Sequence, residues 1–266
     1  MKPPVVLTVA GLDPTGSSGL QADMPTFAAL GVHGLSVATV VTAQDSNSVS
    51  AFHEIPVDLV RAQLDAVVED FSPTATKTGM LKSLELVELV ESAAENKRLG
   101  TLVVDPVMVD SSGAVIVEQS VVRAYRSLAG HATVVTPNRS EAELLAGRSF
   151  DEAGDEVVCA AILDLGVPFV VVTGGRGTGD EVEDLVAHSG GLETIVGHRI
   201  GTDTIRGTGC TFSAALTASL SSGTGPVQAA ANAHEFVREQ LLLTDFLTLG
   251  SGRPGVPHVT GLDISD

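Results

Sequence analysis

Short apolar runs rich in valine and threonine alternate along the chain with longer amphipathic stretches. The clearest amphipathic stretch covers residues 57–71, where apolar residues recur at the spacing of one helical face: Leu59, Val60, Leu64, Val67, Val68 and Phe71. By the same pattern we expect further helices over residues 21–31, 84–100, 140–147, 155–166, 210–221 and 227–243. The apolar runs predict strands over residues 5–11, 35–44, 75–80, 101–107, 132–138 and 168–175, and a hairpin from 184–188 and 193–200.

This alternation predicts the α/β class, because right-handed βαβ units give a mostly parallel central sheet with helices on both faces. The sequence has no long linker or repeat, so we expect residues 1–266 to form a single domain. In such sheets, ligands bind beyond the carboxyl ends of the strands. We therefore look for chemistry in the loops that follow strands, at residues 10–19, 42–48, 77–81, 105–113, 136–141 and 173–179.

A glycine-rich turn, "RGTGC", runs directly into the apolar helix predicted from residue 210. The first backbone N–H groups of a helix have no intrahelical partner and carry the positive end of its dipole. Gly207 and Gly209 leave room for an anion such as phosphate to approach them. We expect the same environment to lower the pKa of the Cys210 thiol, which could then accept a proton. The residues alone leave open a tight turn with a small space-filling cysteine.

Two acids follow neighbouring apolar runs and suggest a magnesium site. Asp105 ends a strand in "VVDPVM", and Glu141 opens the helix after "TPN", with Ser140 as the expected N-cap and Glu143 three residues later. Magnesium binds one or two carboxylates together with phosphate oxygens and water. Taken alone, Glu141 fits a first-turn acid that stabilises the helix dipole better than a metal ligand, and Asp23 likewise fits a solvated surface acid.

Other nucleotide-binding motifs are incomplete. The stretch "GLDPTGSSG" almost forms a Walker A loop but lacks its lysine, and "GGRGTG" lacks the dinucleotide-binding spacing. We assign no role to the seven histidines, because they show no metal-ligand spacing.

Composition excludes several classes of protein. The 15 basic and 33 acidic residues give a formal net charge of −18, which provides no broad surface for nucleic acid or an anionic membrane. Two distant cysteines, Cys159 and Cys210, form neither a disulfide framework nor a zinc site. The first apolar run is too short for a signal peptide, and no run spans a bilayer, so we expect a cytoplasmic protein.

Six segments, taken together, resemble a known family. They are "AGLDPTGSSGLQAD", "TAQDSNSV", "KTGML", "VVDPVM", "TPNRSEAELLAG" and "RGTGCTFSAALTA". They are spread over a span from Gly11 to Ala218 that includes most of the chain. In this order they resemble the hydroxymethylpyrimidine/phosphomethylpyrimidine kinases of thiamine biosynthesis, in the ribokinase-like superfamily. The resemblance implies a three-layer α/β/α fold. It also implies an enzyme that uses ATP and Mg²⁺ to phosphorylate the hydroxyl of hydroxymethylpyrimidine and then the monophosphate.

The resemblance also assigns roles by position. Cys210 corresponds to the residue that activates the substrate hydroxyl, and the turn formed by Gly207, Thr208 and Gly209 to the one that stabilises the transferring phosphoryl group. Asp105 and Glu141 correspond to acidic residues near magnesium. Asn138 and Thr173 correspond to positions along the nucleotide phosphates. The pyrimidine is expected to contact Asp23, Gln44, Met80 and Val107, with Arg206 and Lys77 as candidate cations for the second phosphorylation.

The sequence departs from the family pattern at two positions and leaves two other functions open. Arg206 stands where the family often has histidine, and Thr173 where it often has lysine. The first alternative is a pyridoxal or pyridoxine kinase on the same fold; dedicated pyridoxal kinases commonly carry aspartate where this chain has Cys210. The second is a non-catalytic regulator that binds the pyrimidine phosphate. Relatives are often homodimers, but no interface can be derived from the sequence.

Overall fold

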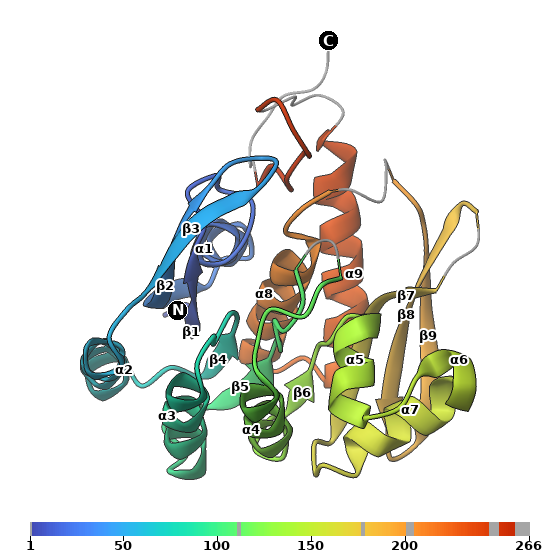
Figure 1. Cartoon of the computed structure of the whole chain (residues 1–266), viewed down its shortest axis with the longest axis horizontal. Coiled ribbons are helices and arrows are strands. Elements are labelled where there is room, and N and C mark those ends of the chain that lie inside the picture. The colour runs from blue at the N-terminus through green and yellow to red at the C-terminus, as the bar shows by residue number, and fades with distance from the viewer. Residues whose placement is uncertain (1, 111–112, 177–178, 201–204, 245–249, 259–266) are drawn as a thin grey trace.

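The computed structural model describes residues 2–110, 113–176, 179–200, 205–244 and 250–258. Its strands form one nine-stranded sheet in the order β3-β2-β1-β4-β5-β6-β7-β8-β9 (Figure 1). Strands β2, β1, β4, β5, β6 and β7 are parallel, whereas β3 at one edge and the β8–β9 hairpin at the other are antiparallel to their neighbours. The strands are β1 Val5–Leu12, β2 His33–Gln44, β3 Val49–Glu54, β4 Ala75–Thr78, β5 Thr101–Val104, β6 Val134–Val135, β7 Phe169–Arg176, β8 Glu181–His188 and β9 Gly191–His198.

Helices cover both faces of this sheet, which confirms the predicted three-layer α/β/α class with a mostly parallel centre. Helices α1, α8 and α9 pack on one face, and α2, α3, α4, α5 and α7 on the other (Figure 1). The helices are α1 Leu20–Ala29, α2 Val57–Phe71, α3 Leu84–Glu95, α4 Gln119–Ala129, α5 Arg139–Ala146, α6 Phe150–Ala153, α7 Asp155–Leu163, α8 Thr208–Ser221 and α9 Pro226–Leu242.

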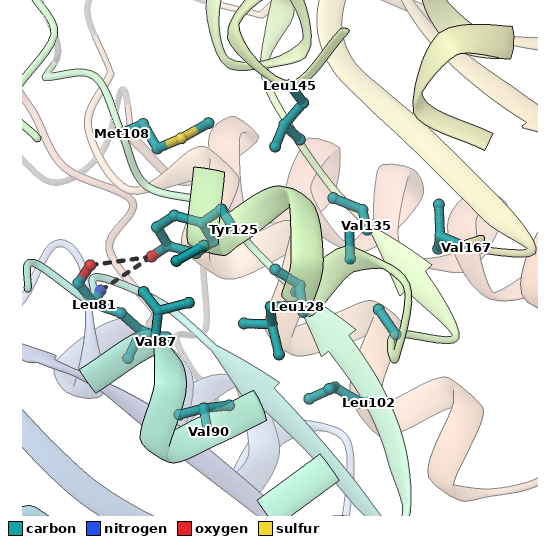
Figure 2. Packing of buried hydrophobic residues seen from close by; sticks show 14 of the residues in the cluster. Leu81, Val87, Val90, Leu102, Met108, Tyr125, Leu128, Val135, Leu145 and Val167 are labelled. Carbon is teal, nitrogen blue, oxygen red and sulfur yellow. Dashed lines mark hydrogen bonds between the residues drawn. The ribbon is translucent and has the colours of Figure 1, made fainter. Parts of the chain in front are cut away.

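Alternate residues of the central strands enter opposite halves of the core. In β5, Leu102 and Val104 pack in the cluster under α3, α4 and α5, whereas Val103 packs against α8 and α9. This follows from the two-residue period of a strand that is buried on both faces. Figure 2 shows part of the larger cluster, in which the Tyr125 ring is fully buried among Leu81, Val87 and Leu128.

Three elements were not expected from the pattern, and one helix start was wrong. Strand β3 and helix α6 lie in stretches without clear periodicity. Helix α4 was overlooked although Val121, Val122, Tyr125 and Leu128 recur at the spacing of one helical face. Helix α5 begins after Asn138 rather than Ser140. The Asn138 side chain accepts the Glu141 N–H at 3.0 Å, and the Glu141 carboxylate accepts the Asn138 N–H at 3.0 Å. This reciprocal capping box satisfies two helix N–H groups, which explains the earlier start.

Candidate active site

Helix α8 begins at a turn that only glycine can form. Gly207 is the N-cap, with φ at 87°, and a Cβ there would overlap the carbonyl oxygen of Ser17 in the loop after β1. The N–H groups of the first turn, from Thr208 to Cys210, therefore face the site with no intrahelical acceptor. As predicted from "RGTGC", the structure combines a close backbone approach with the positive end of a helix dipole.

Cys210 is partly buried at this turn, and its thiol does not behave as expected. Burial raises the pKa of Cys210 to about 12, and the nearby Asp105 and Asp23 carboxylates add to the rise. The Lys77 ammonium and the Gly19 N–H oppose it but are outweighed. Our expectation of a lowered pKa was therefore wrong, because removing the thiolate from water costs more free energy than the Lys77 charge and the Gly19 N–H restore.

Lys77 and Asp23 form a fully buried ion pair beside Cys210. The Lys77 Nζ lies 2.9 Å from both carboxylate oxygens of Asp23, and the Thr8 hydroxyl donates to Asp23 Oδ2 at 2.6 Å. Burial lowers the pKa of Lys77, but Asp23, with smaller contributions from Cys210 and Asp105, raises it further, so the ammonium stays charged. Asp23 was predicted to bind the pyrimidine and Lys77 to bind phosphate. Neither has exposed surface here from which to reach a ligand.

The two predicted metal acids are also buried, and one hydroxyl joins Asp105 to the Cys210 turn. Ser213 Oγ lies 2.8 Å from Asp105 Oδ2 and 3.1 Å from the Cys210 carbonyl oxygen. The Glu141 carboxylate accepts the N–H groups of Asn138 at 3.0 Å and Met108 at 3.1 Å. Asp105 follows β5 and Glu141 lies in the first turn of α5, so both acids stand at the carboxyl edge of the sheet.

The electrostatics of these acids fit a bound cation. Burial, together with the Asp105 charge, raises the pKa of Glu141 to about 8, despite three backbone N–H groups that stabilise its carboxylate. Burial likewise raises the pKa of Asp105. Two buried carboxylates that repel each other become favourable when a divalent ion neutralises them, and oxygen donors of this kind suit Mg²⁺. The residues present therefore fit the predicted metal.

Three of the four residues predicted to contact the pyrimidine lie at the ends of β2, β4 and β5, whereas Asp23 lies in α1. Gln44 ends β2, where its Oε1 accepts the Thr42 hydroxyl at 3.3 Å. Met80 and Val107 follow β4 and β5, and both are partly exposed. Arg206 is already engaged, because its guanidinium donates to Asp13 Oδ2 at 3.1 Å and to the Asp45 carbonyl oxygen at 2.9 Å.

A cavity of about 690 Å³ opens on the other side of the α8 turn. Its lining includes four residues predicted for the nucleotide or the transferring phosphoryl group: Asn138, Thr173, Thr208 and Gly209. It also includes Asp184 and His234, to which the sequence analysis gave no role. The only sequence signal for Asp184 is an acid at the start of an apolar run, and His234 shows no spacing that would identify it.

No helix within the described ranges has the length and apolar character needed to cross a membrane. The family model of phosphomethylpyrimidine kinase matches residues 13–256. A hydroxymethylpyrimidine/phosphomethylpyrimidine kinase from Rhizobium meliloti (strain 1021) is 39% identical over 260 residues, which cover 96% of each chain.

Solved structures show the same fold. The pyridoxal kinase from Staphylococcus aureus in complex with ADP superposes with a TM-score of 0.88 at 30% identity, over 97% of this chain and 94% of that one. A phosphomethylpyrimidine kinase from Clostridium difficile 630 superposes with a TM-score of 0.77 at 31% identity, over 89% of this chain and 98% of that one. By its sequence and its fold, this chain belongs to the phosphomethylpyrimidine kinase family.

Proposed function

We propose that this protein transfers a phosphoryl group from ATP to the hydroxymethyl group of 4-amino-5-hydroxymethyl-2-methylpyrimidine and then phosphorylates the monophosphate to the diphosphate, in thiamine biosynthesis. One observation carries the proposal: the α8 turn supplies Thr208 and Gly209 to the lining of a large cavity, and Ser213 joins the Cys210 carbonyl oxygen of the same turn to Asp105. The names of relatives support the substrate and the pathway, including a rice enzyme named as a probable thiamine biosynthetic bifunctional enzyme.

The phosphate donor in this proposal is ATP, bound in the cavity on the nucleotide side of the turn. The kinase family and the ADP complex of the Staphylococcus aureus relative support this donor. Asn138 and Thr173 would contact its phosphates. Asp105 and Glu141 would hold Mg²⁺, which supplies charge neutralisation when bound.

The protein contributes mainly position and charge to this reaction. The backbone N–H groups from Gly207 to Gly209 would receive the transferring phosphoryl group, since phosphoryl transfer depends largely on electrostatic stabilisation and alignment. Gln44, Met80 and Val107 would orient the pyrimidine, and Cys210 would accept the hydroxyl proton. Because burial raises the pKa of Cys210 to about 12, the thiol keeps its proton in the free enzyme at neutral pH, and proton acceptance should improve as the pH rises.

A pyridoxal kinase is the second candidate, because pyridoxal kinases share this fold at high structural similarity. Parallel assays with hydroxymethylpyrimidine and pyridoxal, each with ATP and Mg²⁺, separate the two functions. We expect ADP release, and a higher kcat/KM, with the pyrimidine. A higher kcat/KM for pyridoxal would replace the first proposal with the second. Binding of the pyrimidine without ADP release would indicate a non-catalytic regulator.

A further inference from the structure

Strand β7 bulges where it reaches the nucleotide-side cavity. In its pairing with β8, Val172 lies opposite Leu185 and Arg176 opposite Glu183. Residues 173–175 therefore stand opposite Asp184 alone, and the regular ladder of backbone hydrogen bonds is interrupted there. Gly174 adopts a φ of 59° inside the bulge, a conformation that favours glycine.

The Asp184 side chain replaces the missing ladder bond. Its Oδ1 accepts the Gly174 N–H at 2.7 Å, and its Oδ2 lies 2.7 Å from His234 Nδ1 on α9. The exposed fractions of the two side chains are 6% for Asp184 and 12% for His234. One nearly buried carboxylate thus ties the bulge of β7 to the helix that covers the other side of the cavity.

The bulge determines where two predicted nucleotide contacts lie. Thr173, its first residue, donates its N–H to the Pro137 carbonyl oxygen at 3.0 Å and forms an isolated parallel bridge with Asn138. Thr173, Gly174, Asn138, Asp184 and His234 all line the same cavity. A change in the bulge would therefore move Thr173 against the capped start of α5 and alter the wall of the nucleotide site.

The charges around His234 favour its protonated form. The hydrogen bond with Asp184 is the largest effect that raises the pKa of His234; burial opposes it, and Glu235 adds to it. Arg238, also on α9, lowers the pKa but is paired with Glu235 at 2.9 Å. Strand β9 brings Gly197 against the imidazole and His198 into the same cavity, and the α8 residues that line the cavity, Thr208, Gly209 and Phe212, carry no ionisable side chain.

We infer that Asp184 and His234 are a positioning pair for the nucleotide: Asp184 holds the 173–175 bulge in its receptive form, and protonated His234 holds Asp184 and adds positive charge to the cavity. This inference rests on the proposed use of ATP. The pair acts on nucleotide affinity and leaves pyrimidine affinity unchanged. Since His234 loses its charge as the pH rises, ADP should bind more weakly at higher pH.

The test measures ADP binding by calorimetry in Asp184→Ala, His234→Gln and the wild type. Asp184→Ala removes both acceptors, and we expect ADP affinity to fall about tenfold. His234→Gln keeps a hydrogen-bond donor but cannot carry the charge. Between about pH 6 and pH 9, the ADP affinity of the wild type should change more than titration of the ADP phosphates alone would cause. His234→Gln should lose this additional change.

A second histidine–carboxylate pair on the same hairpin provides the matched control. His188 Nε2 lies 2.8 Å from Glu193 Oε1 at the opposite end of β8, and neither residue lines the cavity. His188→Gln should keep the wild-type ADP affinity and its pH profile. Kinetics should place the Asp184→Ala effect in the KM for ATP, with the KM for the pyrimidine unchanged.

Two results would overturn the inference. One is His234→Gln with the same pH profile as His188→Gln, and the other is Asp184→Ala with equal losses for ADP and the pyrimidine. If Asp184→Ala does not fold, the comparison of the two histidine variants still decides. A wild-type protein that binds no ADP would contradict the proposed function itself, which is a different outcome from ADP binding that is insensitive to these variants.

Discussion

The two sides of the α8 turn handle charge in opposite ways. On the pyrimidine side, Lys77 is paired with Asp23 and Arg206 with Asp13, so the cations there already have partners within the protein. At the proposed metal site, Asp105 and Glu141 are both buried and repel each other. The Lys77 ammonium attracts Asp105 from a distance, but within the described residues no cation forms an ion pair with either acid. The charges of Lys77 and Arg206 are thus balanced without a ligand, whereas the repulsion between Asp105 and Glu141 would be reduced by a bound cation.

This difference explains why two acids that look alike in sequence are expected to behave differently. Asp23 is neutralised inside the protein and contributes to the shape and field of the site. Glu141 repels Asp105, and in the proposed function burial of the pair would be the cost of a site that attracts Mg²⁺. A strongly acidic chain, with a formal net charge of −18, can then bind an anionic nucleotide through a metal and backbone N–H groups.

Removal of the Lys77 charge should cause the largest loss of folding stability. Lys77→Met leaves the Asp23 carboxylate buried without its cation, so we expect the free energy of unfolding to fall by about 3–5 kcal/mol. The matched control is Arg98→Met, because Arg98 pairs with Asp65 at 2.7 Å on the surface. That variant should lose at most about 1 kcal/mol in the same urea titrations.

A double variant tests whether the loss comes from the uncompensated charge. Lys77→Met/Asp23→Leu removes both charges and should recover much of the stability lost in Lys77→Met. Equal instability of the single and double variants would show that packing, rather than the ion pair, accounts for the effect.

Removal of the Cys210 thiol should separate turnover from binding. Cys210→Ala is expected to lower kcat at least about 10²-fold, the lower limit for loss of a general base, while the pyrimidine and ADP still bind. Cys210→Asp should keep part of the activity, because a carboxylate can accept the proton. Steady-state kinetics with calorimetry measure both effects, and loss of binding with an unchanged kcat would contradict the role as base.

The pH dependence of kcat/KM provides a second test of Cys210 as the base. Burial raises the pKa of Cys210 to about 12, so the thiolate fraction in the free enzyme rises about tenfold per pH unit below that value. In the wild type, kcat/KM for the pyrimidine should therefore increase with pH through the neutral range. In Cys210→Asp this increase should be absent, because the carboxylate is ionised at lower pH.

The fold was largely predictable because the signal that specifies it is local. Helix α2 has the predicted ends at residues 57 and 71, and every strand of the parallel centre was expected. Strand β3 was missed because it is an edge strand with almost no buried residue, so no alternation marks it. Helix α4 was missed although its pattern was present, because Val121, Val122, Tyr125 and Leu128 recur at the spacing of one buried helical face.

The site was predictable only where residues close in sequence act together. The Gly207–Cys210 turn could be identified from five consecutive letters, and the Asp105 and Glu141 positions from strand ends. The pKa of Cys210 could not be predicted from the sequence. It depends on burial and on Lys77, Asp105 and Asp23, which only the fold brings near the thiol. The Asp184–His234 contact joins residues 50 positions apart and left no pattern to detect.

Removal of one proposed metal ligand should have an intermediate effect, on the Mg²⁺ dependence of activity. Glu141→Gln keeps the capping box, because glutamine can still accept the Asn138 N–H, but it cannot ionise to balance the charge of a bound metal. We expect the Mg²⁺ concentration for half-maximal activity to rise about tenfold, with little change in folding stability. The exposed Glu152→Gln on α6 is the control for loss of one acid, and an equal shift in both variants would remove Glu141 from the metal site.

The smallest expected effect tests how the core supports the pyrimidine side. The buried Tyr125 hydroxyl accepts the Leu81 N–H at 3.1 Å (Figure 2). It also lies 3.3 Å from the Gly79 carbonyl oxygen, so it holds the chain on either side of Met80. Tyr125→Phe leaves these groups unsatisfied and should cost about 1–2 kcal/mol of the free energy of unfolding. The KM for the pyrimidine should rise several-fold while ADP affinity stays constant.

Wild-type fluorescence can examine the same link without a mutation. Tyr125 is the only tyrosine and the chain has no tryptophan, so ultraviolet emission from tyrosine reports this residue alone. If the 79–81 loop adjusts when the pyrimidine binds, the hydroxyl changes its partners and the emission changes. In the proposed function, ADP would lie in the cavity at the start of α8, whose lining does not include Tyr125, and it should leave the emission unchanged. An equal response to both ligands would mean that the two sides of the turn move together rather than as separate halves.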